Sequence, residues 1–275
     1  MYEQIVYEVD DPVATITLNR PDSLNGWTMR MAAEVRHAVW QAEADPAVVG
    51  IIITGAGRAF CAGADMGDLT TLTEGGDIRG GWPELEVPVD PSIPDDFTGE
   101  YTYLLATQKP IVAAINGAVA GMAVPIALCC DVRFMANDAP LITAFARRGL
   151  IAEWGLSWLL PRVVGTAAAM DLLISSRRVT GEEAAELGLV TASMPPEEVV
   201  PHSHAYIEEI AATCSPTSIA IIKRQLNEQS HAGLGKAERE AQGLMLESFG
   251  RPDFREGVTS FLQKRPPKFE RLGDG

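Results

Sequence analysis

Apolar and polar residues alternate in two short segments near the start of the chain. Residues 5–9 (IVYEV) and 13–18 (VATITL) place apolar side chains at roughly every second position, which is typical of half-buried β-strands. Asp10, Asp11 and Pro12 separate the two segments and favour a tight turn. The pattern therefore predicts a β-hairpin.

A helical pattern follows the hairpin, and continuous apolar segments follow the helix. Residues 28–43 carry apolar side chains at helical spacing, with Thr28 as the expected N-cap. Residues 48–54, 111–115 and 131–136 are rich in β-branched or small apolar residues and predict buried strands. The first two are each followed by a turn of small residues and a helix. This alternation predicts stacked β-β-α units.

The segment 67–108 interrupts the alternation. It contains paired glycines, four prolines and six acidic residues between Glu84 and Glu100. An irregular stretch of this length is either a lid over a site or a passive insertion. Trp82 and Phe97 are the residues that would form the apolar underside of a lid.

Beyond residue 140 the pattern becomes mainly helical. Thr180 and Glu183 form a capping box, and Gly188 is placed to end that helix. We expect three or four further helices from about residue 203 to the end, and no linker divides the chain.

Composition and charge exclude several classes of protein. The 275 residues are 47% hydrophobic, enough for one large core, and the net charge is −15 with a pI near 4.7. Because the acidic chain has no basic run, nucleic acid is not an expected partner. The N-terminus lacks the apolar region of a signal peptide, and the apolar runs are too short to cross a membrane. We therefore expect a cytoplasmic protein with no membrane contact.

The cysteines and histidines show no metal-binding or redox spacing. The four cysteines, Cys61, Cys129, Cys130 and Cys214, contain no C-x-x-C pair and are expected to be reduced, buried small residues. No H-E-x-x-H motif occurs, so no metal site is predicted. His202 and His204 stand in a polar segment that suggests a solvated helix start.

Two glycine-containing turns carry the most chemical information. In AFCAGAD (59–65) and NGAVAGMA (116–123), small residues allow a ligand to approach the backbone closely. One N–H group from each turn, converging on a single oxygen, would form an oxyanion hole. Small-residue turns also close many α/β units for packing reasons alone, so the pattern leaves both interpretations open.

Six blocks of sequence occur in order over almost the whole chain. They are LNRPDSLNG (18–26), GIIITGAGRAFCAGADM (50–66), KPIVAAINGAVAGMAVPIALCCDVRF (109–134), LLPRVVG (159–165), GEEAAELGLV (181–190) and FREGVTSFLQKR (254–265). Together they resemble the crotonase (enoyl-CoA hydratase/isomerase) superfamily. The resemblance implies an α/β fold in which a spiral of β-β-α units over residues 1–200 binds acyl-CoA. A helical region over residues 201–275 would assemble trimers or dimers of trimers.

The resemblance also implies a set of site residues. The N–H groups of Ala64 and Met122 would hold the thioester carbonyl of an acyl-CoA. The surrounding contacts to substrate would come from Asp22, Ser23 and Leu24 along the adenine and the 3′-phosphate end, from Ala62, Gly63, Asp65 and Gly121 at the turns, and from Phe261 and Lys264, which in this family sometimes act across a subunit boundary. Coenzyme A would enter as part of the substrate, and no prosthetic group is expected.

The chain departs from the family pattern at two positions. Hydratases of the family carry one glutamate four residues after the second turn and another about twenty residues later, where this chain has Pro125 and Phe145. Neither residue transfers a proton. Pro125 stands in a first helical turn, where its missing N–H costs little, so the N–H of Met122 is expected to remain available. Phe145 would add an apolar wall to the acyl pocket.

Glu153 is the candidate acid and base. It follows Phe145 by eight residues, an offset at which dienoyl-CoA isomerases and 3-hydroxyacyl-CoA hydrolases of the family similarly place an acid. The neighbouring Ile151, Trp154 and Leu156 suggest an apolar environment suited to proton transfer. Alternatively, Glu153 begins a helix or pairs with Arg147 or Arg148. Trp154 is a candidate wall of the acyl pocket, although tryptophans at helical spacing are also typical of a core.

Three other acids have structural interpretations. Asp65 is more simply explained as a helix cap, with Asp68 beside it, and Asp131 is expected to pair with Arg133.

The number of acids favours one reaction. Moving a double bond needs one base that takes a proton from one carbon and returns it to another, whereas hydration is easily shared by two carboxylates. A single glutamate thus favours isomerisation over hydration. A non-catalytic acyl-CoA binder and a thioester hydrolase stay open as alternatives.

Overall fold

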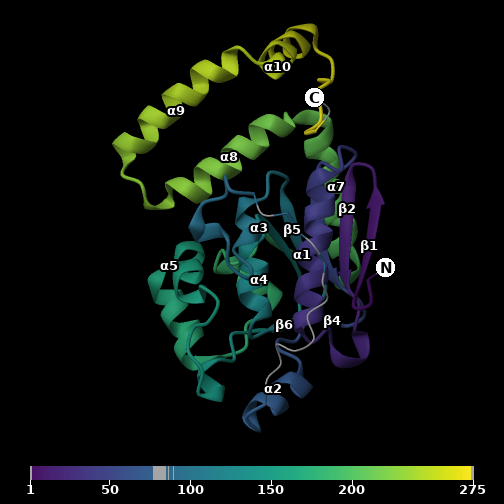
Figure 1. Cartoon of the computed structure of the whole chain (residues 1–275), viewed down its shortest axis with the longest axis vertical. Helices are drawn as coiled ribbons and strands as arrows, with labels where there is room; N and C mark the ends of the chain where they lie inside the picture. Colours follow the sequence, from purple (N-terminus) through teal and green to yellow (C-terminus); the bar gives the residue numbers. More distant parts are fainter. Residues whose placement is uncertain (1, 77–84, 86, 89, 274–275) are drawn as a thin grey trace.

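A six-stranded sheet forms the centre of the molecule (Figure 1). The computed structural model describes residues 2–76, 85, 87–88 and 90–273. The strands lie in the order β1 (Ile5–Asp10), β2 (Val13–Leu18), β3 (Gly50–Gly55), β5 (Ile111–Ile115), β7 (Val132–Ala136) and β9 (Ala192–Met194). Strands β1 and β2 are antiparallel and the other neighbouring pairs are parallel. The predicted hairpin and the three predicted buried strands are confirmed.

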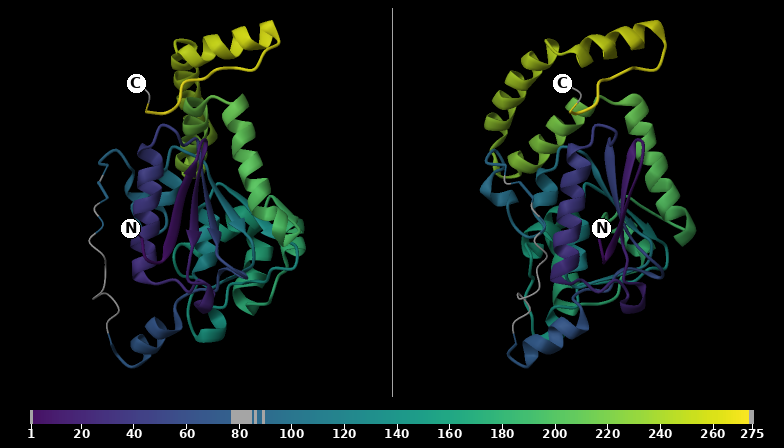
Figure 2. Two further views of the ribbon diagram at one scale, coloured as in Figure 1. Left: turned by 90° about the vertical axis from the view of Figure 1, so that its right-hand side faces the viewer. Right: turned by 45° about the vertical axis from the view of Figure 1, so that its right-hand side comes forward.

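Helices cover both faces of this sheet, and every residue of β3 and β5 is buried. Helix α1 (Met29–Ala44) lies against β1 and β2, and α7 (Pro196–Thr213) lies on the opposite face (Figure 2). The hydroxyl oxygen of Thr28 accepts a hydrogen bond from the N–H of Met31 at 3.1 Å, so the predicted cap of α1 is confirmed.

Three short parallel strands form a second sheet. In the sequence, each of them directly follows a strand of the first sheet. These are β4 (Ala59–Cys61), β6 (Ala118–Ala120) and β8 (Leu141–Ile142). The helices that follow them are α2 (Met66–Thr73), α4 (Ala123–Cys129) and α5 (Leu156–Ser175). The chain thus passes through β3–β4–α2, β5–β6–α4 and β7–β8–α5. The predicted β-β-α units are confirmed. In each unit, the chain leaves a strand of the small sheet and then forms a helix.

Among the described residues, α5 is a helix long and apolar enough to cross a membrane. It is broken at Gly165, whose φ of 77° and ψ of 161° are not helical. Five of its side chains are buried, those of Leu156, Leu159, Leu160, Ala169 and Leu172. The bend and these core contacts are typical of a helix that packs on a globular domain.

The C-terminal part is helical, as predicted. It contains α6 (Gly181–Glu186), α8 (Pro216–Glu228), α9 (Leu234–Phe249) and α10 (Pro252–Gln263) in addition to α7. The Thr180 hydroxyl accepts from the N–H of Glu183 at 3.2 Å, which is the N-cap half of the predicted capping box, whereas the Glu183 carboxylate pairs with Arg177 at 2.6 Å. Helices α9 and α10 extend away from the sheets (Figures 1 and 2). The position chosen to divide the chain, residue 200, falls inside α7, which packs on the sheet.

Helix α7 changes the interpretation of two histidines. His202 and His204 lie within this helix rather than at its start, so the predicted helix start is wrong, but His202 is exposed to solvent as predicted and His204 is half-buried. The His202 ring meets Phe134 of β7 edge-to-face at 4.5 Å, and His204 Nε2 lies 3.3 Å from the hydroxyl oxygen of Thr15. Both rings therefore contact residues of the sheet. They stand inside the helix because α7 begins six residues before His202, at Pro196.

The segment 67–108 contains short helices at its two ends. After α2, the structure describes η2 (Asp95–Phe97) and α3 (Tyr103–Ala106). Phe97 is buried, at 8% exposure, as are Tyr101 and Leu104. Trp82, the other apolar residue proposed for the underside of a lid, lies outside the described residues.

A buried lysine fastens α8 to the body of the protein. Lys223 Nζ forms an ion pair with Asp131 at 2.7 Å and donates to the Leu104 carbonyl oxygen at 3.2 Å. Asp131 also accepts from the N–H of Ile111 at 2.7 Å. The expected pairing of Asp131 with Arg133 is wrong, because the Arg133 guanidinium is used by main-chain carbonyl oxygens. The true partner, 92 residues away in the chain, left no local sequence signal.

We expect Lys223→Ala to lower the free energy of unfolding by about 3–5 kcal/mol, because it leaves a partly buried carboxylate without its cation. Urea denaturation measures the change. The control is Arg177→Ala, which removes solvent-accessible ion pairs with Asp171 and Glu183 and is expected to cost less than about 1 kcal/mol. Equal losses in the two variants would contradict the role given to Lys223.

Candidate active site

Two turns lie side by side at one edge of the small sheet. Because β4 and β6 are parallel, with Ala59 opposite Ala118, their carboxyl ends reach the same edge. The turns that follow contain Gly63 and Gly121, with φ values of 101° and 53°. A Cβ atom added to Gly63 would lie 3.0 Å from the Ala120 carbonyl oxygen and 3.8 Å from the Gly121 Cα. The backbones of the two turns are therefore in contact.

The N–H group of Ala64 in the first turn is unpaired. Trp27 bridges this turn: its N–H donates to the Gly63 carbonyl at 2.8 Å and its carbonyl accepts from Asp65 at 3.0 Å. Ala64 stands between Gly63 and Asp65, the two residues that bond to Trp27. In a parallel bridge, the N–H of such a middle residue points away from the bridging strand. Among the described residues, no group accepts a hydrogen bond from the Ala64 N–H.

The N–H group of Met122 in the second turn is unpaired as well. Met122 directly precedes α4, and the first N–H groups of a helix have no acceptor inside it. The part of the chain that the structure describes offers the Met122 N–H no other acceptor. Pro125 is the buried third residue of α4, so its ring occupies a position whose N–H would also lack a helical acceptor.

Asp65 is held in place by the residues around it. Its Oδ2 accepts from Arg20 at 2.8 Å, and its Oδ1 accepts from the N–H groups of Gly67 and Asp68, as a cap of α2. Burial alone would raise the pKa of Asp65, but the hydrogen bonds from Arg20 and Gly67 bring this pKa below its usual value. The carboxylate thus fixes the first turn. Arg20 was not singled out from the sequence, because its partner is 45 residues away.

The segment around Leu24 is attached to the first turn. The Leu24 carbonyl accepts from the Ala62 N–H at 3.0 Å. The fully buried Asn25 amide donates to two carbonyl oxygens of β4, at 2.8 and 3.2 Å. Asp22 and Ser23, in η1 (Pro21–Ser23), are exposed next to this attachment. The residues expected along coenzyme A therefore adjoin the first turn. In the sequence, the Asn25-Gly26 pair indicates a turn. It does not indicate that the Asn25 side-chain amide is buried and bonds to β4.

Glu153 lies in the turn that precedes α5, and its carboxylate is unpaired. The residues after it, Trp154 and Gly155, have φ values of 56° and 75°. The Glu153 side chain is half-buried and has no hydrogen-bond or ion-pair partner among the described residues. The alternative pairing with Arg147 or Arg148 is therefore not formed.

The surroundings of Glu153 differ in part from the expected apolar environment. Leu156 is fully buried, but Ile151 is 78% exposed and Trp154 is 42% exposed. Within the chain, apolar burial next to Glu153 comes from the α5 side.

Aromatic rings connect the turn of Glu153 to the turn of Ala64. The Trp27 ring, which belongs to the residue that bridges Ala64, lies 5.8 Å from the Tyr101 ring. Tyr101 in turn lies 5.1 Å from the Trp154 ring. Burial raises the pKa of Tyr101 well above its ordinary value, so the phenol is uncharged at neutral pH. The sequence did not identify Tyr101, because it follows an irregular segment with no periodic pattern.

Other predicted site residues lie apart from the turns or in the core. Phe145 is buried, at 6% exposure, and packs in the main hydrophobic core. Phe261 and Lys264 lie in and directly after α10, at the end of the molecule opposite α2 (Figure 1). The Phe261 side chain is 81% exposed. Within one chain, Phe261 and Lys264 do not reach the two turns.

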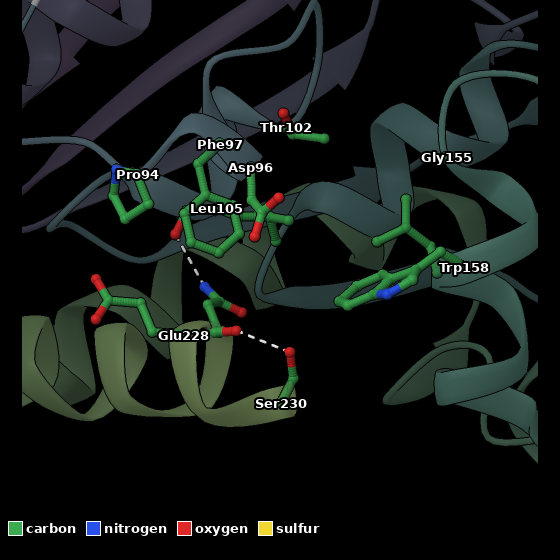
Figure 3. Close-up of a pocket in the computed structure, with 11 residues that line it drawn as sticks. Pro94, Asp96, Phe97, Thr102, Leu105, Gly155, Trp158, Glu228 and Ser230 are labelled. Atoms are coloured by element: carbon green, nitrogen blue, oxygen red, sulfur yellow. Dashed lines mark hydrogen bonds between the residues drawn. The ribbon is translucent and has the colours of Figure 1, made fainter. Parts of the chain in front are cut away.

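A pocket of about 360 Å³ opens next to the turn of Glu153 (Figure 3). Segments of η2, α3, α5 and the end of α8 form its walls, and Gly155 belongs to its lining. Phe97, Leu105 and Trp158 supply apolar surface, while Asp96 and Glu228 supply carboxylates. The described lining contains no basic residue. The size is that of a small-molecule site.

Three of the four cysteines are buried in the core and unsuited to act as nucleophiles. All four are free, and Cys61, Cys129 and Cys130 are buried as predicted, whereas Cys214 is partly exposed. Burial raises the pKa of Cys61 and of Cys129 to about 12, which keeps both as thiols. Within the described ranges, no group of three or more His, Cys, Asp or Glu side chains is arranged to hold a metal ion.

Known proteins resemble the chain over its whole length. A family sequence model described as enoyl-CoA hydratase/isomerase matches residues 8–272. The chain is 34% identical to a 1,2-epoxyphenylacetyl-CoA isomerase of Escherichia coli, over 98% of this chain and 99% of the relative. It is also 34% identical to a probable enoyl-CoA hydratase of Rhodobacter capsulatus, over 98% of each. A solved structure of a probable enoyl-CoA hydratase/isomerase from Mycobacterium abscessus has a TM-score of 0.83 and 26% identity, over 96% of this chain and 98% of that one.

We expect Gly63→Ala to destabilise the protein more than Gly188→Ala, by about 1–3 kcal/mol, because only the first adds an atom in an already packed place. Both glycines have positive φ, so both substitutions strain the backbone. However, a Cβ at Gly188 has open space around it. Chemical denaturation measures both losses, and a Gly63→Ala loss no larger than that of the control would show that the turns are not in close contact.

Proposed function

We propose that this chain, which belongs to the enoyl-CoA hydratase/isomerase family, moves a double bond along the acyl group of a CoA thioester. The observation that carries the proposal is the pair of unpaired N–H groups, from Ala64 and Met122, on two turns that touch. In this proposal both donors bind the thioester carbonyl oxygen, where negative charge develops as a proton leaves the adjoining carbon. A preorganised donor of this kind contributes about 3–4 kcal/mol to transition-state stability.

Glu153 serves as the single acid and base. Its carboxylate takes a proton from one carbon of the acyl group, and the electron pair left behind is delocalised onto the thioester oxygen. Return of the same proton to a different carbon completes the shift of the double bond and restores the carboxylate. Support comes from the unpaired carboxylate, since no ion pair has to be broken before the proton is transferred.

Isomerisation is preferred to hydration because a second acid is missing from the expected positions. Pro125 and Phe145 stand where the family resemblance expects glutamates, and neither activates a water molecule. The relative from Escherichia coli is named as an isomerase of an epoxyphenylacetyl-CoA, which supports isomerisation of a CoA thioester as a class but not the shift of a double bond. The relative from Rhodobacter capsulatus is named as a probable hydratase, so hydration is the competing reaction in the test below.

Coenzyme A is bound as part of the substrate, along the segment next to the first turn. We assign this contact to Asp22, Ser23 and Leu24, and the close approach of the thioester to Ala62, Gly63, Asp65 and Gly121. Support comes from the hydrogen bond between Leu24 and Ala62, which holds the two parts together. The reaction as proposed uses only carbonyl polarisation and proton transfer, and it needs no prosthetic group.

The distal part of the acyl group enters the pocket next to Glu153. Gly155 lines the pocket and lies two residues from the acid. The apolar walls suit a hydrocarbon group, and the carboxylates of Asp96 and Glu228 oppose entry of the CoA phosphates or of an acyl group that ends in a carboxylate. Phe145 and Trp154 contribute further apolar surface to the acyl site in this proposal.

Residues 201–275 assemble a trimer or a dimer of trimers. Apolar side chains are exposed on α9 and α10, including Phe249, Phe254, Phe261 and Leu262, and a surface of this kind is typical of an interface. Phe261 and Lys264 of one subunit then complete the CoA site of a neighbouring one. Lys264 supplies positive charge for the phosphates in a protein whose net charge is −15. We place this assembly in the cytoplasm.

We expect Glu153→Gln to lower kcat on an enoyl-CoA substrate by about 10²–10⁴-fold, the usual contribution of a general acid–base residue. Affinity for the acyl-CoA should stay within a factor of about two, because an amide of the same shape keeps the binding contacts. Absorbance of the conjugated thioester measures turnover, and calorimetry measures binding. Glu182→Gln, at the exposed start of α6, is the control and should leave both unchanged.

The same assay separates the alternatives. Wild-type protein that binds acyl-CoA but converts no member of an enoyl-CoA panel is a binding protein, and release of free CoA in a thiol assay identifies a hydrolase. Addition of water, detected as a 3-hydroxyacyl product, identifies a hydratase. Each outcome would replace the proposed isomerisation.

We expect Lys264→Ala to raise the KM for acyl-CoA while kcat changes little, because the lysine binds a remote part of the substrate. Co-expression with Glu153→Gln should restore a wild-type KM to part of the activity, since mixed assemblies contain sites with an intact Glu153 and a neighbour's intact Lys264. Analytical ultracentrifugation gives the assembly size in parallel. A monomeric protein with an unchanged KM would rule out the shared site.

A further inference from the structure

The backbone at Trp154 is held in an unfavourable conformation. Its φ of 56° lies in the left-handed region, which bulky side chains rarely adopt. Gly155, which follows, has the same sign of φ at no steric cost. A strained residue of this kind persists only where its surroundings fix it. Some contact of the Trp154 side chain must therefore hold the turn that carries Glu153.

Tyr101 provides this contact. Its ring packs edge-to-face against Trp154, with centroids 5.1 Å apart and planes at 60°. Its other side packs against Trp27, at 5.8 Å and 80°. Edge-to-face pairs at these separations are favourable beyond the burial of area. Tyr101 is 4% exposed, so it fills the space between the two tryptophans.

Tyr101 is itself anchored to the core. Its carbonyl oxygen accepts from the N–H of Leu104 at the start of α3. Helix α3 is bound to α8 by two hydrogen bonds, from Lys223 to the Leu104 carbonyl and from Asn227 to the Leu105 carbonyl. The ring is therefore supported by a fixed element rather than by a free loop.

We propose that Tyr101 is a positioning residue, which sets the distance between the Glu153 carboxylate and the oxyanion donors. Trp27 ties it to the Ala64 turn through the main-chain bridge, and Trp154 ties it to the Glu153 turn. The ring makes both aromatic contacts. The roles of the two turns in the reaction rest on the proposed function. The mechanical link, which is the packing of Tyr101 between Trp27 and Trp154, does not depend on that function.

The mechanical link is tested by hydrogen exchange of the amides at residues 150–155 in Tyr101→Leu, Tyr101→Phe and wild-type protein. We expect Tyr101→Leu to increase exchange there by at least about tenfold relative to α6, which contains neither Tyr101 nor Tyr206, and Tyr101→Phe to match wild type. The matched control is Tyr206→Leu, because Tyr206 also packs edge-to-face, against Phe134 at 5.6 Å, but on the far face of the large sheet. Unchanged exchange in Tyr101→Leu, or an equal increase in the control, would overturn the proposal.

The effect on the reaction is tested by steady-state kinetics. A misplaced catalytic group costs tenfold to about a hundredfold in rate, so kcat of Tyr101→Leu should fall by this amount while KM stays within about threefold. Tyr101→Phe should restore kcat. A rise in KM alone, or a loss of the same size in Tyr206→Leu, would assign Tyr101 a binding or a merely structural role.

Trp154→Gly separates the ring contact from the backbone. Glycine adopts the left-handed conformation without strain but removes the contact with Tyr101. We expect this variant to resemble Tyr101→Leu in both exchange and kcat. Wild-type behaviour of Trp154→Gly would show that the backbone positions Glu153 without the ring and would overturn the proposal.

Failure of the proposed function gives a different result. Glu153→Gln should leave exchange at residues 150–155 unchanged while it removes turnover. If wild-type protein converts no enoyl-CoA, the kinetic arm falls with the proposed function, and the exchange measurements alone decide whether Tyr101 holds the turn.

Discussion

The close contact between two backbone turns is the constraint on which the site depends. Parallel pairing of β4 and β6 brings the turns to one edge, and the absence of a side chain at Gly63 lets its backbone meet the Ala120 carbonyl. Only then can N–H groups from both turns lie near one point. Hydrogen bonds from Arg20 to Asp65 and from Asn25 to β4 support the first turn, whereas the second is continuous with a buried helix.

Local sequence patterns predicted the parts of the fold that local forces determine. β-Branched runs identified β3 and β5, helical spacing and Thr28 identified α1, and small residues marked both turns. The errors concern contacts between distant segments. The partner of Asp131 is on α8, and the anchors of the His202 and His204 rings are on β7 and β2. Tyr101 has no periodic context at all, and its significance depends on which rings surround it in space.

Helix α8 links the outer helices to the site. Lys223 and Asn227 join it to α3, and α3 supports the ring of Tyr101. Beyond α8, the chain continues into α9, which buries no residue within the chain, and then into α10. Helix α8 thus leads into the exposed apolar helices and also supports α3, which lines the pocket. Helices α9 and α10 are therefore connected to α3 through α8, by these hydrogen bonds and by the ion pair of Lys223 with Asp131.

Pro125 stands at a position where the helix places little demand on the residue. The third residue of α4 needs no amide hydrogen, so the backbone at this position accepts an imino acid or an ordinary residue equally well. The residue at position 125 can therefore differ in its side chain, or lack an amide hydrogen, without breaking a hydrogen bond of α4. The fold of this helix start places little restriction on which side chain it presents.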